Sequence, residues 1–215
     1  KSDAFDVLHL AFGKIKEAII PSYIKHISSN AFQPCPELKV IKIEENSELQ
    51  SIGNNAFSCP CIEYIELPSN IIDLKKFWCS KIPNNVEFKI IKKGEENIKI
   101  VDDNFLAGKS DRKSDIFDVL YFVRRTIEEI TVPSYIKRIG AYAFCGCKHL
   151  KTVNFLDDSE LESIGEFAFI DSAIENFIVP SHVKEICNNA FCSCQNIQSI
   201  KFKENSELHT IGSEV

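Results

Sequence analysis

Nine cysteines carry the most reactive side chains of this 215-residue chain, and six of them are arranged as Cys-x-Cys. The three pairs are Cys59 and Cys61, Cys145 and Cys147, and Cys192 and Cys194. Structural zinc sites combine a wider Cys-x2–4-Cys pair with a second ligand pair. The run Cys145-x-Cys147-x-His149 is too tight and too incomplete for such a site, and we predict no metal.

Three of the cysteines share a second regularity. Cys35, Cys147 and Cys194 each lie three residues after a phenylalanine that recurs along the chain. A small, weakly polar side chain at this position fills the inside of a turn, so we predict buried structural thiols. Disulfides between neighbouring repeats are the alternative. An odd number of cysteines, placed by the repeat, favours free thiols over a stapled framework.

Nucleophilic catalysis would need a serine or cysteine brought together with a histidine and a carboxylate. The histidines lie at scattered positions of the repeat, and His26 and His182 follow Pro-Ser turns where a solvated side chain is expected. The chain also has no glycine-rich phosphate loop, because its Ile-Gly pairs recur with the repeat and serve a bend. We predict no catalytic residue, no cofactor and no enzyme activity.

Composition limits the partners. The chain has 44% hydrophobic and 26% charged residues, enough for a folded core, and a net charge of −6. No basic stripe is available to neutralise phosphates, which argues against nucleic acid. Apolar runs such as Val119 to Val123 are far shorter than the roughly 20 residues that span a bilayer, so we expect no membrane segment in this chain. Because it lacks methionine and opens on Lys1, we interpret it as an excerpt of a longer protein.

These residues are positioned by a repeat. Shifted by 112 residues, the chain matches itself without a gap: Pro21 to Lys25 falls on Pro133 to Lys137, and Ser51-Ile52-Gly53 on Ser163-Ile164-Gly165. Self-similarity of this kind predicts a stacked array in which each unit buries its apolar face against its neighbours. We predict a single solenoid domain over 1–215, built from long repeats 1–112 and 113–215.

A shorter repeat lies within the long one. It is anchored on a phenylalanine, usually in Ala-Phe, with spacings that alternate between 25 and 22 residues, as at Phe32, Phe57, Phe144, Phe169 and Phe191. Each coil opens with apolar residues at i, i+3 and i+5, the last two separated by one residue as in a short strand with one inward face. The length difference falls in the turn and in the segment after the phenylalanine, which are surface positions that tolerate change.

One stretch interrupts this rhythm. Ser114 to Arg125 carries Phe117, Leu120 and Tyr121 at helical spacing, with Ser114 or Asp115 as a cap. We predict a short helix there and a twin at Ser2 to Phe12, both covering the outside of the stack.

If the strand residues at i+3 and i+5 point inward, those at i+2 and i+4 form columns on the outer face of the sheet. They are Val40, Lys42, Tyr64, Glu66, Thr152, Asn154, Asn176, Ile178, Ser199 and Lys201. This mixture of charged, aromatic and apolar groups is a candidate protein-binding surface, with Tyr64 as the first candidate because aromatic residues with polar neighbours are typical of hot spots. An ordinary solvated sheet face is the alternative.

The phrase Pro-Ser-x-Ile-Lys-x-Ile-x-x-x-Ala-Phe-x-x-Cys-x-x-Leu-x-x-Ile, at Pro21 to Ile41 and again from Pro133, resembles the BspA-like leucine-rich repeats. This family occurs on surface proteins of oral bacteria, spirochaetes and parasitic protists, and the Phe-Asp-Val-Leu segments look like its protist branch. The chain departs from the pattern at Phe77 to Cys79, at Phe105 and at Ser172. The resemblance implies a leucine-rich-repeat arc of the α/β horseshoe class, with mostly short parallel strands and irregular turns.

The resemblance also implies adhesion to host or extracellular matrix proteins and no enzyme activity. Our leading hypothesis is therefore a cell-surface or secreted, adhesin-like module that binds a protein. An intracellular scaffold in the cytoplasm is the alternative, favoured by free thiols and by the absence of any Asn-x-Ser/Thr sequon. A structural spacer is the third hypothesis. The ligand and the oligomeric state are left open.

Overall fold

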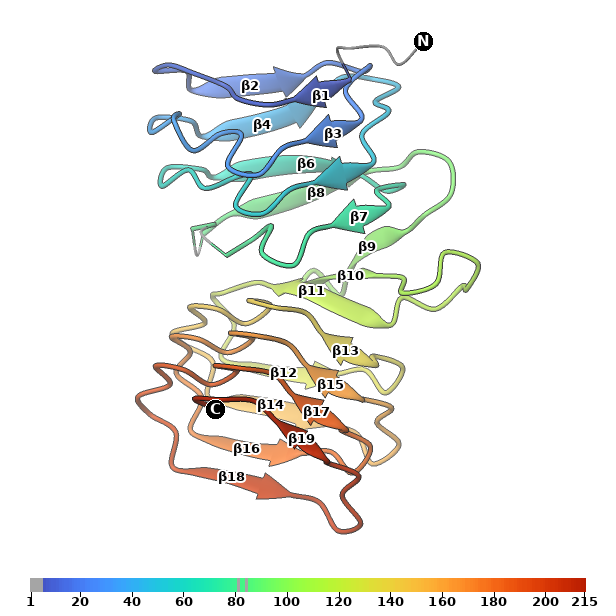
Figure 1. Ribbon diagram of the computed structural model, residues 1–215, viewed down its shortest axis with the longest axis vertical. Coiled ribbons are helices and arrows are strands. Elements are labelled where there is room, and N and C mark those ends of the chain that lie inside the picture. The colour runs from blue at the N-terminus through green and yellow to red at the C-terminus, as the bar shows by residue number, and fades with distance from the viewer. Residues whose placement is uncertain (1–5, 81, 84) are drawn as a thin grey trace. The chain divides into compact units, whose positions relative to one another are not determined.

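The computed structural model describes residues 6–80, 82–83 and 85–215. The chain divides into two compact units, Lys1–Lys99 and Ile100–Val215. Each unit is a stack of coils that return to the same strand positions, so that strands far apart in the sequence pair side by side (Figure 1). Whether the chain behaves as a single domain stays a prediction.

Unit 1 contains two four-stranded sheets whose strands are all parallel. The sheet of longer strands has the order β2-β4-β6-β8, formed by Glu17–Ile20, Val40–Ile43, Tyr64–Pro68 and Glu87–Ile91. The sheet of two-residue strands has the order β1-β3-β5-β7, formed by Val7–Leu8, His26–Ile27, Ser51–Ile52 and Asp73–Leu74.

Unit 2 repeats this plan. Its longer strands form the parallel sheet β12-β14-β16-β18, from Glu129–Val132, Thr152–Phe155, Asn176–Val179 and Ser199–Phe202. The second sheet has the order β19-β17-β15-β13-β11-β10-β9. Its strands are Thr210–Ile211, Glu185–Ile186, Ser163–Ile164, Arg138–Ile139, Val119–Val123, Phe105–Gly108 and Ile98–Val101. The last of these, β9, begins with the final two residues of unit 1.

The register explains why the sequence repeats. Ile41 pairs with Ala18 on one side and with Ile65 on the other, and Phe177 pairs with Ile200. Equivalent residues of successive coils therefore lie one strand apart, so their inward side chains form continuous apolar columns. The predicted inward positions are confirmed at Ile41, Ile65 and Phe177, which are almost completely buried. They are not confirmed on β18, the last strand of its sheet, where Ile200 is half-buried and Phe202 is 47% exposed.

The predicted helices are wrong. The described residues contain no α-helix, and the stretch predicted as Ser114–Arg125 forms β11, antiparallel to β10 and parallel to β13. The run Val119 to Val123 is apolar on both faces and is nearly all buried, a pattern that periodicity cannot separate from a buried helix. Ser114 accepts a hydrogen bond from the Ile116 N–H at 3.0 Å and so closes a turn instead of capping a helix.

The twin helix predicted over Ser2–Phe12 is also wrong where it can be compared. Val7–Leu8 forms β1 and pairs with His26 and Ile27, while residues 1–5 lie outside the described part of the chain. The fold is therefore a β-solenoid of mostly parallel short strands, and the α/β horseshoe class does not describe it.

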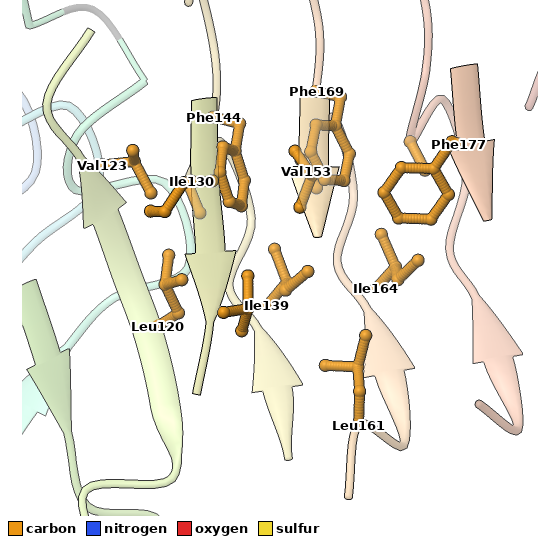
Figure 2. Packing of buried hydrophobic residues seen from close by; sticks show 14 of the residues in the cluster. Leu120, Val123, Ile130, Ile139, Phe144, Val153, Leu161, Ile164, Phe169 and Phe177 are labelled. Carbon is orange, nitrogen blue, oxygen red and sulfur yellow. The ribbon is translucent and has the colours of Figure 1, made fainter. Parts of the chain in front are cut away.

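The anchor phenylalanines form the centre of the core. In unit 2, Phe144 and Phe169 stack with ring centroids 4.5 Å apart, and Phe169 stacks on Phe191 at 5.0 Å. Figure 2 shows Phe144 and Phe169 side by side above the aliphatic residues of the short strands. In unit 1, Phe32 and Phe57 lie 6.0 Å apart at a tilt of 41°. The ring columns of the repeat are thus packed face to face more closely in unit 2.

The coil of unit 1 that departs from the repeat is also packed. Trp78 occupies the position of the small residue before the anchor, and Cys79 occupies the anchor position. Both are buried, and the indole of Trp78 makes an edge contact with Phe88 at 5.7 Å. The larger side chain therefore fills space that a phenylalanine fills in the regular coils.

Candidate functional site

The ten residues predicted to face outward all lie on the longer-strand sheets. On every strand except β18, a buried residue separates the two outward ones. In β16, for example, Asn176 and Ile178 are exposed while Phe177 and Val179 are buried. We call the outer surface of β2-β4-β6-β8 the unit 1 face and that of β12-β14-β16-β18 the unit 2 face. The two faces differ in chemistry.

The unit 1 face is a network of charge pairs. Lys42 Nζ lies 2.7 Å from Glu17 on the preceding strand, and Lys89 Nζ lies 3.8 Å from Glu66. The hydrogen bond and charge of Glu17 raise the pKa of Lys42, which keeps the ammonium protonated. Because each of these charges already has a partner in the sheet, a binding protein would have to replace these contacts to use them.

Glu66 and Tyr64 are held from within the sheet. The Glu66 carboxylate accepts the backbone N–H of Ile43 at 3.1 Å, where the backbone pairing of β4 with β6 ends, and it accepts the Tyr64 hydroxyl at 3.1 Å. Desolvation, with a smaller contribution from Glu66, raises the pKa of Tyr64. Glu66 therefore completes the sheet, and the Tyr64 hydroxyl is already engaged.

The unit 2 face carries amides, hydroxyls and one exposed aliphatic group. Asn154 donates to Glu129 at 2.6 Å and Ser199 donates to Asn176 at 2.7 Å. Ile178 is 51% exposed and stands in register with Lys201, which forms no ion pair with the described residues. An exposed isoleucine surrounded mainly by amides and hydroxyls, with one lysine beside it, has the composition of a small protein-contact patch.

The shorter strands bring together a column that the sequence did not reveal. His26, Ser51 and Asp73 lie in register on β3, β5 and β7, and His26 Nδ1 is 2.8 Å from Ser51 Oγ. A Ser-His-Asp triad needs the carboxylate on the histidine, where it orients the ring. Here the serine stands in the middle strand and Asp73 pairs with Lys75, so the column does not have the order of a hydrolytic site.

On the corresponding side of unit 2, charge pairs join successive coils. Lys137 pairs with Glu160 and Lys184 with Glu162, each at 3.5 Å. His182 Nδ1 lies at hydrogen-bond distance, 3.0 Å, from the Glu207 carboxylate, and these six residues line a depression of about 220 Å³. His182 is exposed, as predicted. Unit 1 has one equivalent pair, between Lys25 and Glu48 at 3.6 Å. Exposed pairs of this kind align neighbouring coils but contribute little to stability.

None of the nine cysteines forms a disulfide, and Cys35, Cys147 and Cys194 are buried, as predicted for their place after the anchor. The reason is visible in two coils: the thiols of Cys59 and Cys194 donate to the carbonyls of Phe32 and Phe169 in the preceding coil, at 3.2 and 3.0 Å. Burial raises the pKa of Cys59 and of Cys147 to about 12, so both are protonated at neutral pH. Protonated buried thiols are poor nucleophiles and poor metal ligands.

Two further findings bear on the sequence predictions. No cluster of three or more metal-binding side chains occurs among residues 6–80, 82–83 and 85–215. Over the same residues, no helix has the length and hydrophobicity needed to cross a bilayer.

Comparisons with known proteins give a consistent picture. The family model described as "BspA type Leucine rich repeat region" matches residues 9–110 and 116–215, with six copies. The chain resembles the structure of the pneumococcal vaccine antigen PcpA, with a TM-score of 0.65 and 19% identity over 93% of this chain and 55% of that one. It also resembles a leucine-rich repeat protein from Eubacterium ventriosum, with a TM-score of 0.71 and 18% identity over 93% and 56%.

The chain thus spans a little over half the length of these two similar structures. At identities below 20%, the likeness establishes the fold. No curated protein sequence matches the chain.

Proposed function

Because the chain belongs to the BspA type leucine-rich repeat family, whose repeats are suited to protein–protein interaction, we propose that it is a non-enzymatic module that binds a protein at a cell surface. The partner class is a host or extracellular matrix protein, as the family resemblance implies. Of the two similar structures, one is described as a vaccine antigen, which fits a surface location. The protist branch of the family remains part of this proposal.

The observation that carries the proposal is the division between the two sides of each strand. Inward residues form a dry, periodic core, while outward residues vary from coil to coil. Among the described residues, the candidate catalytic column His26-Ser51-Asp73 has the wrong order. A long periodic surface suits an extended macromolecule better than a small substrate.

The unit 2 face is the better of the two candidate contact surfaces. Burial of Ile178 by a partner would remove exposed apolar area from water, and the surrounding Thr152, Asn154 and Asn176 would supply hydrogen bonds at the rim. On the unit 1 face, Lys42 and Glu66 would first have to leave existing partners. Tyr64 remains the candidate of that face through its half-buried ring.

The test is a binding assay with the intact chain against purified fibronectin, laminin and collagen. We expect saturable binding to at least one of them, lost in Ile178→Asp and kept in Ile19→Asp, a matched control that is 56% exposed on β2 of unit 1. No binding by a folded chain to any extracellular protein would contradict the surface role. Equal loss in both variants would contradict the choice of the unit 2 face.

An intracellular scaffold is the second candidate, and a specific observation favours it. Five of the nine cysteines are buried as thiols, a state that a reducing compartment preserves. Under this hypothesis the chain should unfold at the same temperature with and without a reductant, and it should aggregate through exposed Cys61 when the reductant is removed. Loss of stability on adding the reductant would instead indicate disulfides and an oxidising compartment.

A further inference from the structure

Unit 2 contains a recess made by a difference in turn length. Five residues separate the anchor from the next inward residue at Phe144 to Leu150 and at Phe191 to Ile197, but only four do so at Phe169 to Ile174. The shortened turn lies between the other two, since Gly146 donates to the Ile170 carbonyl and Asp171 to that of Cys192. The missing residue leaves a depression of about 220 Å³.

The backbone around this recess is left-handed in all three turns. Gly146, Asp171 and Ser193, each two residues after its anchor, have φ angles of 67°, 57° and 58°. L-residues adopt this conformation at a cost, which the packed coils on either side maintain. As a result, the turns hold a fixed shape around the depression.

The lining is polar and rich in hydrogen-bond acceptors. The shortened turn contributes Asp171, Ser172 and Ala173 to the lining, and the following turn contributes Ser193, Gln195 and Asn196. Ser172 is 3% exposed, with its hydroxyl 3.4 Å from the Cys194 sulfur. Lys148 is the one cation of the lining, and it makes no ion pair with Asp171. The Asp171 carboxylate is therefore exposed at the recess without a cation of the lining paired to it.

The field of unit 2 adds to this local charge. Residues 100–215 carry 18 acidic and 12 basic side chains, whereas residues 1–99 carry 13 of each, so the whole net charge of −6 lies in unit 2. A negative surface raises the local concentration of cations and speeds their association. An anionic ligand would meet one lysine and an opposing field, and is disfavoured.

We propose that this recess binds a guanidinium group, presented as an arginine side chain by a polypeptide partner. A guanidinium has five donors in a planar fork, which can engage a carboxylate and the neighbouring amide and hydroxyl oxygens together. An ammonium is a single, strongly hydrated charge and uses such a lining less well. The site is independent of which sheet face binds the partner.

Unit 1 has no equivalent group. Its shortened turn, from Phe57 to Ile62, places Cys59 at the position that corresponds to Asp171, and this thiol is buried and donates to the Phe32 carbonyl. The proposed guanidinium site is therefore a feature of unit 2 alone.

The test is a titration of the whole chain with N-acetyl-arginine amide at low salt, followed by amide NMR shifts. We expect saturable shifts at Asp171, Ala173 and Ser193. Asp171→Asn keeps a residue that tolerates the left-handed conformation, and it should weaken binding about tenfold or more, as when a hydrogen bond to a charged group is lost. Asp158→Asn removes the same charge from a unit 2 turn outside the recess, and it should change affinity less than about twofold.

Three outcomes would overturn the site. N-acetyl-citrulline amide, which is neutral and of similar shape, could bind equally well. Asp158→Asn could weaken binding as much as Asp171→Asn, which would indicate a diffuse field effect. Free arginine could bind where the blocked amide does not, which would exclude a polypeptide source. None of these outcomes bears on the proposed sheet-face function, because the assay uses no protein partner.

Discussion

The two units use the same inward residues and present different outer surfaces. Ile41 of unit 1 and Val153 of unit 2 are equivalent residues and both are buried, while the residues that follow them, Lys42 and Asn154, carry different chemistry. Unit 1 pairs its face charges internally, whereas the unit 2 face carries mainly amides and hydroxyls, and unit 2 holds the net charge of −6. The comparison teaches that the repeat constrains only the packed side, so recognition can diverge on the other.

The largest effect should come from the shared side. Phe169→Ala and Phe57→Ala should each lower the free energy of unfolding by about 3–5 kcal/mol, as truncation of a buried aromatic does. Phe169 should lie at the upper end, because its ring contacts Phe144, Phe177 and Phe191, whereas the Phe57 ring is tilted against that of Phe32. Urea denaturation measures both. A loss below about 1 kcal/mol in either unit would contradict the shared core.

Alkaline pH should destabilise the fold through the buried thiols. Burial raises the pKa of Cys147 from 9.0 to about 12, so its contribution is complete below pH 9 and is lost as the pH rises towards 12. One such thiol lowers stability by up to about 1.4 kcal/mol per pH unit in this window. The loss of unfolding free energy between pH 9 and 10.5 should be smaller in Cys147→Ser, because this variant lacks the thiol. Serine should fit at this position, since Ser172 occupies the same place in another coil. If the dependence of unfolding free energy on pH were the same in the variant, the Cys147 thiol would be exposed to solvent.

Mutations on the two sheet faces should differ in how much binding free energy they remove, and this difference should be smaller than the stability effects above. Ile178→Ala should weaken binding of the extracellular partner by about 2 kcal/mol if it is a hot spot, and Tyr64→Ala by less, because the Tyr64 hydroxyl is engaged by Glu66. Calorimetric titration of both variants measures the difference. If Tyr64→Ala lost more binding free energy than Ile178→Ala, the contact surface would lie on the unit 1 face.

The smallest stability effects should come from two charged residues of the unit 1 face. Glu66 accepts a backbone hydrogen bond, whereas Lys42 only forms an exposed ion pair. Glu66→Ala should cost about 1 kcal/mol or more, because it leaves the Ile43 N–H without its acceptor. Lys42→Ala should leave the midpoint of unfolding unchanged within error, since its ion pair is exposed to water. Equal costs for the two variants would show that Glu66 has no role in completing the sheet.

The sequence predicted the parts that depend on local periodicity. The spacing of residues such as Ile65 and Leu67 identified the strands and their inward sides, and the place of Cys147 after Phe144 identified a buried thiol. The segment around Leu120 was misread, because an apolar run bounded by turns has the same pattern in a strand paired on both sides and in a buried helix.

The chemistry of the outer surface could not be predicted in this way. The bonds of Glu66 to Ile43 and of Ser51 to His26 join residues more than 20 positions apart, so they follow only from the register of neighbouring strands. The alternation of 25 and 22 residues did indicate a shortened segment after the anchor. That this segment at Asp171 lies between two longer turns, and so forms a recess, is a property of the stacked coils.

Native-state hydrogen exchange at the anchor phenylalanines measures whether successive coils share one core. The amides of Phe144 and Phe169 donate to the carbonyls of Ala168 and Ala190 in the following coils, at 2.7 and 2.8 Å. We expect both amides to exchange only through global unfolding of unit 2, and Phe169→Ala to speed the exchange of both amides together. Exchange within minutes at neutral pH, or acceleration confined to the mutated coil, would contradict a core shared by successive coils.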